Sequence, residues 1–330
     1  MVVRKNEGKH HPERRIAVID LGTNTFNLLI AELTHEHTLR FLHRERRPVF
    51  LGRNGIEKNL IAQDAMERAW KVLREYKELA QQHGASKILA YGTSAIRTAH
   101  NADQFNAKAQ ALIDAPINVI EGSEEAQLIY LGVRQSIEPT HETFLIVDIG
   151  GGSNELILAN SETIFWKKSY PIGMARVKAQ FTLSDPITTA EINQLNNYFA
   201  TALADFLHTV HSQYSIQKIV GAEGAFESFL HIAEHIPCSS QSKTSKSILH
   251  SHELSLDCFN QVKEKLIVST LNERLNMKGL EPFRAEMIVP AVVFVDFLLE
   301  KLQYPQMFIS EYSLKEGVAW NYFFPGNEPG

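Results

Sequence analysis

The chain has 330 residues, of which 44% are hydrophobic and 22% are charged, as in ordinary soluble globular proteins. This length predicts two domains with ample hydrophobic cores. The net charge of −5 excludes an overall basic field that would recruit DNA or an anionic membrane, so we expect neither partner. Any site for a polyanion must therefore be a local basic pocket.

The first residues and the cysteines bear on the cellular compartment. Residues 1–14 are polar and basic without the apolar core of a signal peptide, and they predict a disordered lead-in. The longest apolar run, 287–299, is too short to cross a membrane and contains Asp296. Cys238 and Cys258 form neither a CxxC motif nor a disulfide framework, which fits a reducing environment. We therefore expect a cytoplasmic protein.

The first half of the chain alternates strands and helices, which is typical of α/β proteins with parallel pairing. Residues 63–83 have the periodicity of an amphipathic helix, and Gly84 follows it where a C-terminal cap is expected. The other predicted elements are a hairpin at 15–30, strands at 38–50, 87–91 and 117–120, and a helix at 102–113.

The second half repeats this plan. It begins with a hairpin at 144–158, and the polar stretch 237–252 predicts an exposed loop. The remaining elements are strands at 163–170, 217–220 and 307–310, and helices at 188–211, 226–235, 253–276, 284–302 and 314–323. We place the domains at 15–138 and 139–330, with a boundary near Pro139, and the terminal helix can pack back on the first domain.

The two hairpins carry the same motif. In the first, an apolar strand ends at Asp20, and Leu21-Gly22-Thr23-Asn24 precedes the returning strand. In the second, the strand ends at Asp148, and Gly150-Gly151-Gly152-Ser153 precedes a strand that carries Glu155. Turns without side chains let backbone N–H groups approach an anion, and the carboxylates can hold a cation or orient water. The repeat predicts an internal duplication and a cleft between two lips that grip phosphates, whereas a pair of ordinary tight turns is the alternative.

Two such hairpins on duplicated α/β halves resemble the superfamily of actin, sugar kinases and chaperone ATPases, whose domains have a ribonuclease H-like fold. Within it the chain more closely resembles the exopolyphosphatase/guanosine pentaphosphate phosphohydrolase (Ppx/GppA) family. The motifs that carry this resemblance occur in order along nearly the whole chain: Asp20–Phe26, Gly92–Arg97, Glu121–Ala126, Tyr130–Val133, Val147–Leu156, Arg284–Pro290 and Ser313–Gly317.

The resemblance implies a role for each matching residue. Glu125 is implied to activate the water that attacks the terminal phosphorus, and Asp148 and Glu155 to support that water and Mg²⁺, with Mn²⁺ as an alternative ion. All three are candidate metal ligands, and Arg97 is implied to grip phosphate. The phosphate site is implied to be lined further by Asp20, Gly22, Thr23, Asn24, Gly150, Gly151, Gly152 and Ser153. Such residues suit the chemistry, because hydrolysis of a phosphoanhydride needs an in-line water, a carboxylate and neutralised phosphate oxygens.

The implied activity is release of terminal orthophosphate from inorganic polyphosphate, or conversion of guanosine pentaphosphate to the tetraphosphate. Both substrates present a terminal phosphoanhydride, so the sequence leaves the choice between them open, as it does the preferred chain length and the processivity. The family suggests a homodimer. The chain lacks the C-terminal extension and His-Asp motif of the long family members, so it resembles a short, two-domain form.

Two positions depart from the family pattern. Glu223 lies in the late glycine turn, where small or hydroxyl residues are usual, and a glutamate there repels phosphates unless it binds a metal or points away. Lys315 replaces the more usual arginine of the terminal motif, which keeps the charge but loses the bidentate fork.

Other functions are weighed against the hydrolase. A kinase of the superfamily needs an adenine pocket near 221–225, which Glu223 disfavours. A non-catalytic sensor of polyphosphate or guanosine tetraphosphate gains nothing from three carboxylates that face an anion.

Two further clusters of residues have simple structural interpretations. The cluster His231, His235, Cys238, His250 and His252 matches no known zinc spacing, and Arg44, Arg46 and Arg47 predict a solvated strand face, although one of them can reach a polyphosphate tail.

Overall fold

The computed structural model describes residues 14–238, 249–303 and 305–326, and contains two mixed β-sheets. The first sheet has the order β3-β2-β1-β4-β5 and the second β10-β11-β9-β6-β7-β8. The strands are β1 (Arg15–Leu21), β2 (Thr25–Leu33), β3 (Leu39–Pro48), β4 (Lys87–Gly92), β5 (Ile117–Val119), β6 (Phe144–Ile149), β7 (Asn154–Ala159), β8 (Ile164–Tyr170), β9 (Lys218–Ala222), β10 (Ser251–Glu253) and β11 (Gln306–Ser310).

The two sheets share one topology. In the first, β1 and β2 form an antiparallel hairpin that β3 extends, and β4 and then β5 add in parallel on the other side of β1. In the second, β6, β7 and β8 repeat the antiparallel part, while β9 and β11 repeat the parallel part and β10 closes the edge. This repetition confirms the duplicated ribonuclease H-like plan predicted from the two hairpins.

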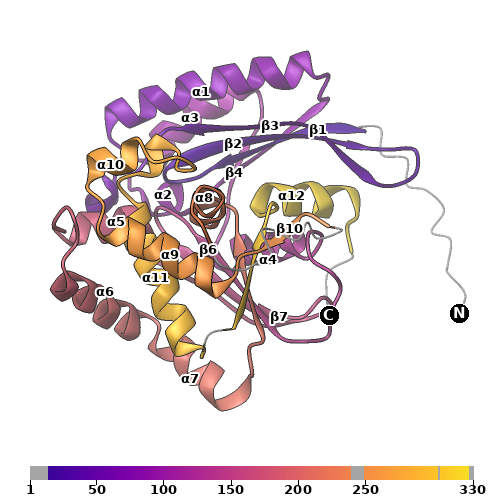
Figure 1. The fold of residues 1–330 in the computed structure, drawn as a ribbon. Helices are drawn as coiled ribbons and strands as arrows, with labels where there is room; N and C mark the ends of the chain where they lie inside the picture. The colour runs from indigo at the N-terminus through magenta and orange to yellow at the C-terminus, as the bar shows by residue number, and fades with distance from the viewer. Residues whose placement is uncertain (1–13, 239–248, 304, 327–330) are drawn as a thin grey trace, which may run out of the picture.

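The helices form three layers, which alternate with the two sheets. α1 and α3 cover the outer face of the first sheet, α4 and α12 lie between the sheets, and α6 to α9 with α11 cover the outer face of the second (Figure 1). Their bounds are α1 (Gln63–Gln82), α2 (Ser94–Thr98), α3 (Ala102–Ile113), α4 (Gly122–Val133), α5 (Met174–Gln180), α6 (Thr189–Ala202), α7 (Ala204–Gln213), α8 (Gly224–Ala233), α9 (Leu256–Ile267), α10 (Leu271–Leu275), α11 (Ile288–Lys301) and α12 (Leu314–Phe323). Two 3₁₀ turns occur at η1 (Ile56–Lys58) and η2 (Pro282–Arg284).

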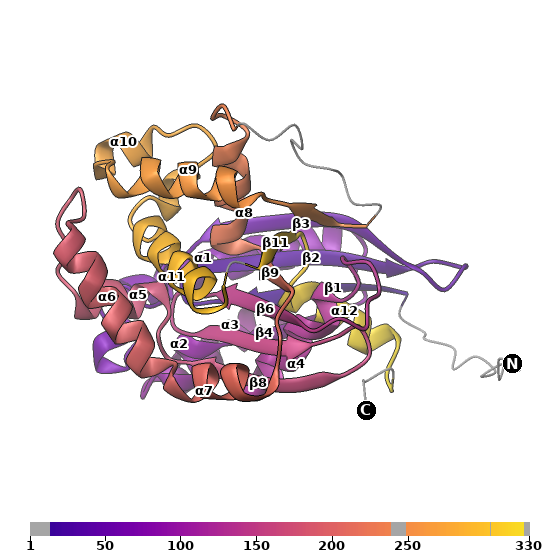
Figure 2. The same cartoon turned by 60° about the horizontal axis from the view of Figure 1, so that its bottom comes forward.

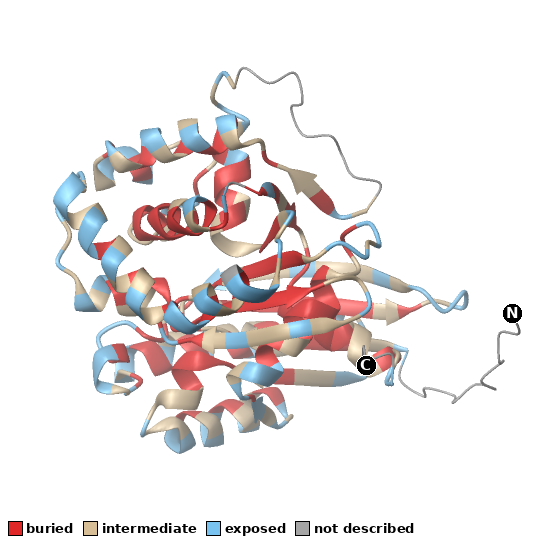
Figure 3. Ribbon diagram, turned by 90° about the horizontal axis from the view of Figure 1, so that it is seen from below, coloured by how far each residue is buried: buried red, intermediate tan, exposed pale blue. Residues whose placement is uncertain are grey.

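The middle layer joins the two halves of the chain. α12, the last helix, packs on α4 and also contacts β1 and β2 of the first sheet. Figure 3 shows the strands and the helices around them as mainly buried, with exposed residues on the outer helices. Side chains alternate between faces along a strand, so Ile16 and Val18 of β1 join the middle core, while Ala17 and Ile19 join the outer one. The boundary between the domains stays a prediction.

Several predicted elements differ from the structure. The helix at 188–211 is interrupted at Leu203, whose backbone leaves the helical conformation (φ −103°, ψ 16°). The helix at 253–276 divides because Thr270 and Glu273 form a capping box that starts α10, and Figures 1 and 2 both place α9 beside α10 and α11. Strand β10 lies in a stretch predicted to be a loop, although residues 239–248 of that loop lie outside the described residues, as do residues 1–13 of the lead-in.

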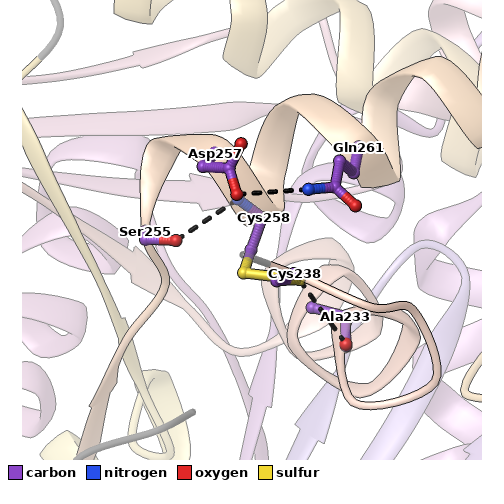
Figure 4. Close-up of a disulfide and its surroundings, with 6 residues drawn as sticks. All are labelled: Ala233, Cys238, Ser255, Asp257, Cys258 and Gln261. Carbon is purple, nitrogen blue, oxygen red and sulfur yellow. Dashed lines mark hydrogen bonds between the residues drawn. A yellow bond between two sulfur atoms is a disulfide. The ribbon is translucent and has the colours of Figure 1, made fainter. Parts of the chain in front are cut away.

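The two cysteines are paired, which the sequence does not predict. Cys238 follows α8 and Cys258 lies on α9; these two helices pack together, and a disulfide joins the residues with their Cα atoms 5.2 Å apart (Figure 4). The expectation of two unpaired cysteines is therefore wrong. None of the helices described for this chain is long and apolar enough to cross a membrane.

Candidate active site

Three carboxylates reach the middle layer from strands. Asp20 is the second-last residue of β1, and Asp148 and Glu155 lie directly opposite each other on β6 and β7. Each lies two positions from a residue of the middle core, so the pleat directs all three to the space between the sheets. Those core residues are Val18, Ile146 and Ile157.

The fourth carboxylate comes from a helix. Glu125 lies in the first turn of α4 and is buried. Arg97, on α2, donates from Nη1 to Oε2 of Glu125 at 2.9 Å and to the carbonyl oxygen of Ile120 at 2.7 Å. Arg97 therefore holds the Glu125 carboxylate in place. Arg97 is not among the residues that line the cavity described below, and its role in gripping phosphate stays a prediction.

The two glycine turns face each other at very short range. A Cβ added to Gly151 would lie 2.6 Å from the Asn24 side chain, and one added to Gly152 would lie 2.5 Å from Oγ of Ser94 and 2.8 Å from Oγ1 of Thr23. Real Cβ atoms do not approach other atoms so closely. Glycine is needed here because the two lips of the cleft touch.

The second turn presents free backbone N–H groups. The carbonyl oxygens of Gly150 and Gly151 accept from the N–H groups of Met174 and Ala175, at the start of α5. In a planar trans peptide the N–H points away from the C=O, so the N–H groups of Gly151 and Gly152 point away from α5. Among the described residues they have no hydrogen-bond acceptor. Such unpaired donors suit an anion.

These elements enclose a cavity of about 170 Å³. Every predicted site residue except Arg97 lines it, and both halves of the chain contribute. The cavity lies between the two hairpins, where the duplication predicts a phosphate-gripping cleft. Its predicted lining residues are Asp20, Gly22, Thr23, Asn24, Glu125, Asp148, Gly150, Gly151, Gly152, Ser153 and Glu155.

Burial and mutual repulsion dominate the electrostatics of the carboxylates. Burial, followed by the charge of Glu155, raises the pKa of Asp148 to about 8. Burial raises the pKa of Asp20 to about 6, against a hydrogen bond from Asn27. Burial and the charge of Glu155 raise the pKa of Glu125 well above its usual value, and burial raises that of Glu155 as well. Burial and mutual repulsion therefore outweigh the nearby cations, among them Arg97 beside Glu125.

Two hydroxyl groups fix these carboxylates and were not predicted. Oγ of Ser313 donates to Oδ2 of Asp148 at 2.7 Å, and Oγ of Ser169 donates to Oε1 of Glu155 at 2.6 Å. Ser313 opens the terminal motif, which was a signal that could have found it, whereas nothing in the sequence marks Ser169.

Three cations line the other part of the cleft: Arg46, Arg284 and Lys315. The prediction of a solvated face is wrong for Arg46, because β3 directs this side chain to the carboxylates of Glu223 and Glu227. Lys315 is buried and pairs with Glu223, so the glutamate that the sequence could not place has a cationic partner.

Across residues 14–238, 249–303 and 305–326, no three His, Cys, Asp or Glu side chains form a group that could hold a metal ion. This applies to the trio Glu125, Asp148 and Glu155 and to the described His and Cys residues near α8.

Comparisons with known proteins identify the family of this chain. A model of the Ppx/GppA phosphatase family matches residues 29–322, so the chain belongs to this family of phosphatases. It is 29% identical to exopolyphosphatase 2 of Mycobacterium tuberculosis over 92% of this chain and 97% of that protein. It is 26% identical to the guanosine-5′-triphosphate,3′-diphosphate pyrophosphatase of Pseudoalteromonas atlantica, over 97% of this chain but 61% of that protein.

The fold of this chain also matches a solved structure. The crystal structure of an exopolyphosphatase from Cytophaga hutchinsonii superposes with a TM-score of 0.87 at 33% identity, and the match covers 94% of this chain and 97% of that one. The fold predicted from two hairpins is thus the fold of a Ppx/GppA protein over nearly its full length.

Proposed function

We propose that this protein hydrolyses the terminal phosphoanhydride of inorganic polyphosphate, of guanosine pentaphosphate, or of both. The observation that carries the proposal is the convergence of four carboxylates and two glycine turns on one cleft of a Ppx/GppA phosphatase. The relatives named above are an exopolyphosphatase and a guanosine pentaphosphate pyrophosphatase, which is why both substrates are retained.

Glu125 is the general base. Its pKa is raised by burial and by the charge of Glu155, so it is a stronger base than an exposed glutamate. Its carboxylate accepts a proton from water while the water oxygen attacks the terminal phosphorus and the anhydride P–O bond breaks. Arg97 keeps that carboxylate oriented through the 2.9 Å hydrogen bond.

The glycine turns bind the phosphate that is transferred. The unpaired N–H groups of Gly151 and Gly152 are donors for its oxygens, and Thr23 and Asn24 lie on the facing lip.

A divalent cation fits the acidic side of the cleft. Asp148, Glu155 and Asp20 offer hard oxygen donors, and burial raises the pKa of each, so a bound cation would stabilise their ionised forms. Mg²⁺ usually binds through one or two carboxylates together with waters and substrate phosphates, so three converging side chains are not required. When bound, the ion would neutralise phosphate oxygens. Mg²⁺, a homodimer and the cytoplasmic location all stay predictions.

The test is phosphate release with Mg²⁺ from polyphosphate and from guanosine pentaphosphate, for the unmodified protein and for Glu125→Gln. The substitution keeps the shape of the side chain and removes its charge and basicity. We expect release that falls by about 10²–10⁴-fold in the variant, with the ratio of the two rates ranking the substrates. Glu124→Gln, one residue away on α4 but outside the cleft, is the matched control.

A protein that binds both substrates tightly but releases no phosphate would contradict the hydrolase. It would instead support the alternative, a non-catalytic sensor of polyphosphate or guanosine tetraphosphate.

A further inference from the structure

The cationic end of the cleft is already charge-paired. Arg46 donates from Nη1 to Oε2 of Glu227 at 2.8 Å and from Nη2 to Oε2 of Glu223 at 3.3 Å. Lys315 donates from Nζ to Oε1 of Glu223. Arg284 has its own carboxylates, with Oε2 of Glu227 3.3 Å from Nη2 and another acidic side chain on Nε. Each cation available to a substrate phosphate in this cleft is therefore held by a protein anion.

Among these carboxylates, Glu223 alone lines the cleft itself. It lies in the turn between β9 and α8, immediately after Ala222, which is the neighbour of Asp148 in the sheet. Its two carboxylate oxygens contact two different cations, Oε1 on Lys315 and Oε2 on Arg46. A bridging anion with two oxygens is also how a phosphate group would engage this pair.

The backbone of Glu223 supports a role in the site. Its φ of 44° with ψ of −146° lies in a region that side-chain-bearing residues rarely adopt. Holding a non-glycine residue there costs backbone strain, and such strained residues cluster at functional sites.

We propose that Glu223 is a built-in counter-anion, which occupies the place of a substrate phosphate on Lys315 and Arg46 and must be displaced when a polyphosphate-type anion binds. This inference rests on the proposed function, because it concerns the affinity of the same cleft for its anionic substrate. The consequence is a cleft that binds polyanions more weakly than its cations allow, and that releases anionic products readily.

A role for Glu223 in positioning the cations would change the affinity for anions in the opposite direction. If Glu223 served to position Lys315 and Arg46 for phosphate, removing its charge would leave two misplaced cations and weaken anion binding. If it competes with phosphate, removing its charge takes one carboxylate from each cation, leaves Arg46 with Glu227 and Lys315 with Glu316, and strengthens anion binding. The direction of the change in affinity therefore separates the two roles.

The experiment measures binding of inorganic tripolyphosphate by titration calorimetry, in EDTA so that no hydrolysis accompanies binding. For Glu223→Gln we expect a Kd about 10-fold lower than for the unmodified protein, the equivalent of about 1.4 kcal/mol, with a steeper dependence on salt. The control is Glu311→Gln. It removes the same charge from a neighbouring cavity, but Glu311 pairs with His250 and His252 rather than with the cleft cations, so its Kd should be unchanged.

An unchanged or higher Kd in Glu223→Gln overturns the proposal. Glu223→Ser, measured in parallel with a thermal melt of each variant, gives the answer should the glutamine variant fail to fold. Failure of the proposed function is distinguishable, because a protein without phosphate release can still show the tighter binding of tripolyphosphate.

Discussion

The two hairpins that form the cleft are copies with one decisive difference. In both, an aspartate is the second-last residue of the first strand and pairs across the hairpin with the residue seven positions later, so Asp20 faces Asn27 and Asp148 faces Glu155. Asn27 donates from Nδ2 to Asp20 at 2.8 Å. Glu155 has no hydrogen to donate when ionised, and its charge adds to that of Asp148.

This difference gives the two hairpins different roles in the cleft. The amide of Asn27 satisfies Asp20, so the first hairpin needs no further positive charge at that point, and the pKa of Asp20 is raised only to about 6. In the second hairpin, burial and then the charge of Glu155 raise the pKa of Asp148 to about 8, so a cation beside Asp148 would stabilise its ionised form. We infer that the duplicated turn binds phosphate on both lips, and that the reacting water and the cation belong to the second.

The largest expected effect comes from substitutions that make each hairpin resemble the other at the position that faces the aspartate. Glu155→Gln gives the second hairpin an amide like that of Asn27, and we expect kcat for phosphate release to fall by about 10²–10⁴-fold because a carboxylate of the reaction is lost. Asn27→Asp gives the first hairpin a second carboxylate. It should lower kcat/KM by about 10-fold, the equivalent of about 1.4 kcal/mol, because a donor to Asp20 is lost.

Initial rates in saturating Mg²⁺ measure both variants. Equal losses of activity in the two variants would mean that the hairpins contribute alike to catalysis. The inference that they have different roles would then be wrong. Glu162→Gln, exposed in the turn between β7 and β8, controls for the loss of one charge on the same hairpin.

The local part of this site could be predicted from the sequence. Strand, aspartate and glycine turn are consecutive in the chain, so the pattern around Asp148 defines both the hairpin and the direction of its carboxylate. The duplicated motif then predicts two such turns face to face, and the contact of Gly151 with Asn24 confirms it. Periodicity also located α1, α3 and α12 to within one or two residues.

The partners of those residues could not be predicted, because they come from distant parts of the chain. Ser313 reaches Asp148 across 165 positions, and Arg46 reaches Glu223 across 177. Their identities alone look like a helix cap and a solvated charge. Only the packing of α12 between the sheets, and of β3 beside α8, brings them to the cleft. The disulfide between Cys238 and Cys258 likewise depends on the packing of α8 on α9.

A smaller effect tests whether the two turns are true copies. Gly22 and Gly150 occupy matching positions, and each donates its N–H to the carbonyl oxygen three residues later. A Cβ would lie 2.7 Å from the Thr25 oxygen in the first turn and 2.5 Å from the Ser153 oxygen in the second. Because these are backbone atoms, we expect Gly22→Ala and Gly150→Ala each to lower the free energy of unfolding by about 1–3 kcal/mol.

Urea unfolding of both variants measures this cost. Gly92→Ala is the control, since its added Cβ would meet only side-chain atoms, at 3.1 Å or more, and should cost less. A large cost at one turn and none at the other would show that the turns differ in geometry as well as in charge.

The smallest effect concerns the aspartates themselves. A carboxyl whose pKa is raised by folding destabilises the folded protein at every pH above its unfolded-state pKa, because the ionised form is disfavoured inside. Asp148 carries the larger rise, to about 8 against about 6 for Asp20. Without metal at neutral pH, Asp148→Asn should therefore raise the free energy of unfolding by about 0.5–2 kcal/mol, and Asp20→Asn by less.

Each asparagine keeps an oxygen that can accept the existing hydrogen bond, from Ser313 in one case and from Asn27 in the other, so the comparison isolates the charge. Urea unfolding in EDTA measures the stabilities, and phosphate release should be lost in Asp148→Asn although it is the more stable protein. A variant less stable than the unmodified chain would mean that the Asp148 carboxyl is satisfied without a cation. The acidic pair of the second hairpin would then be a structural feature rather than the reason that this lip needs a metal.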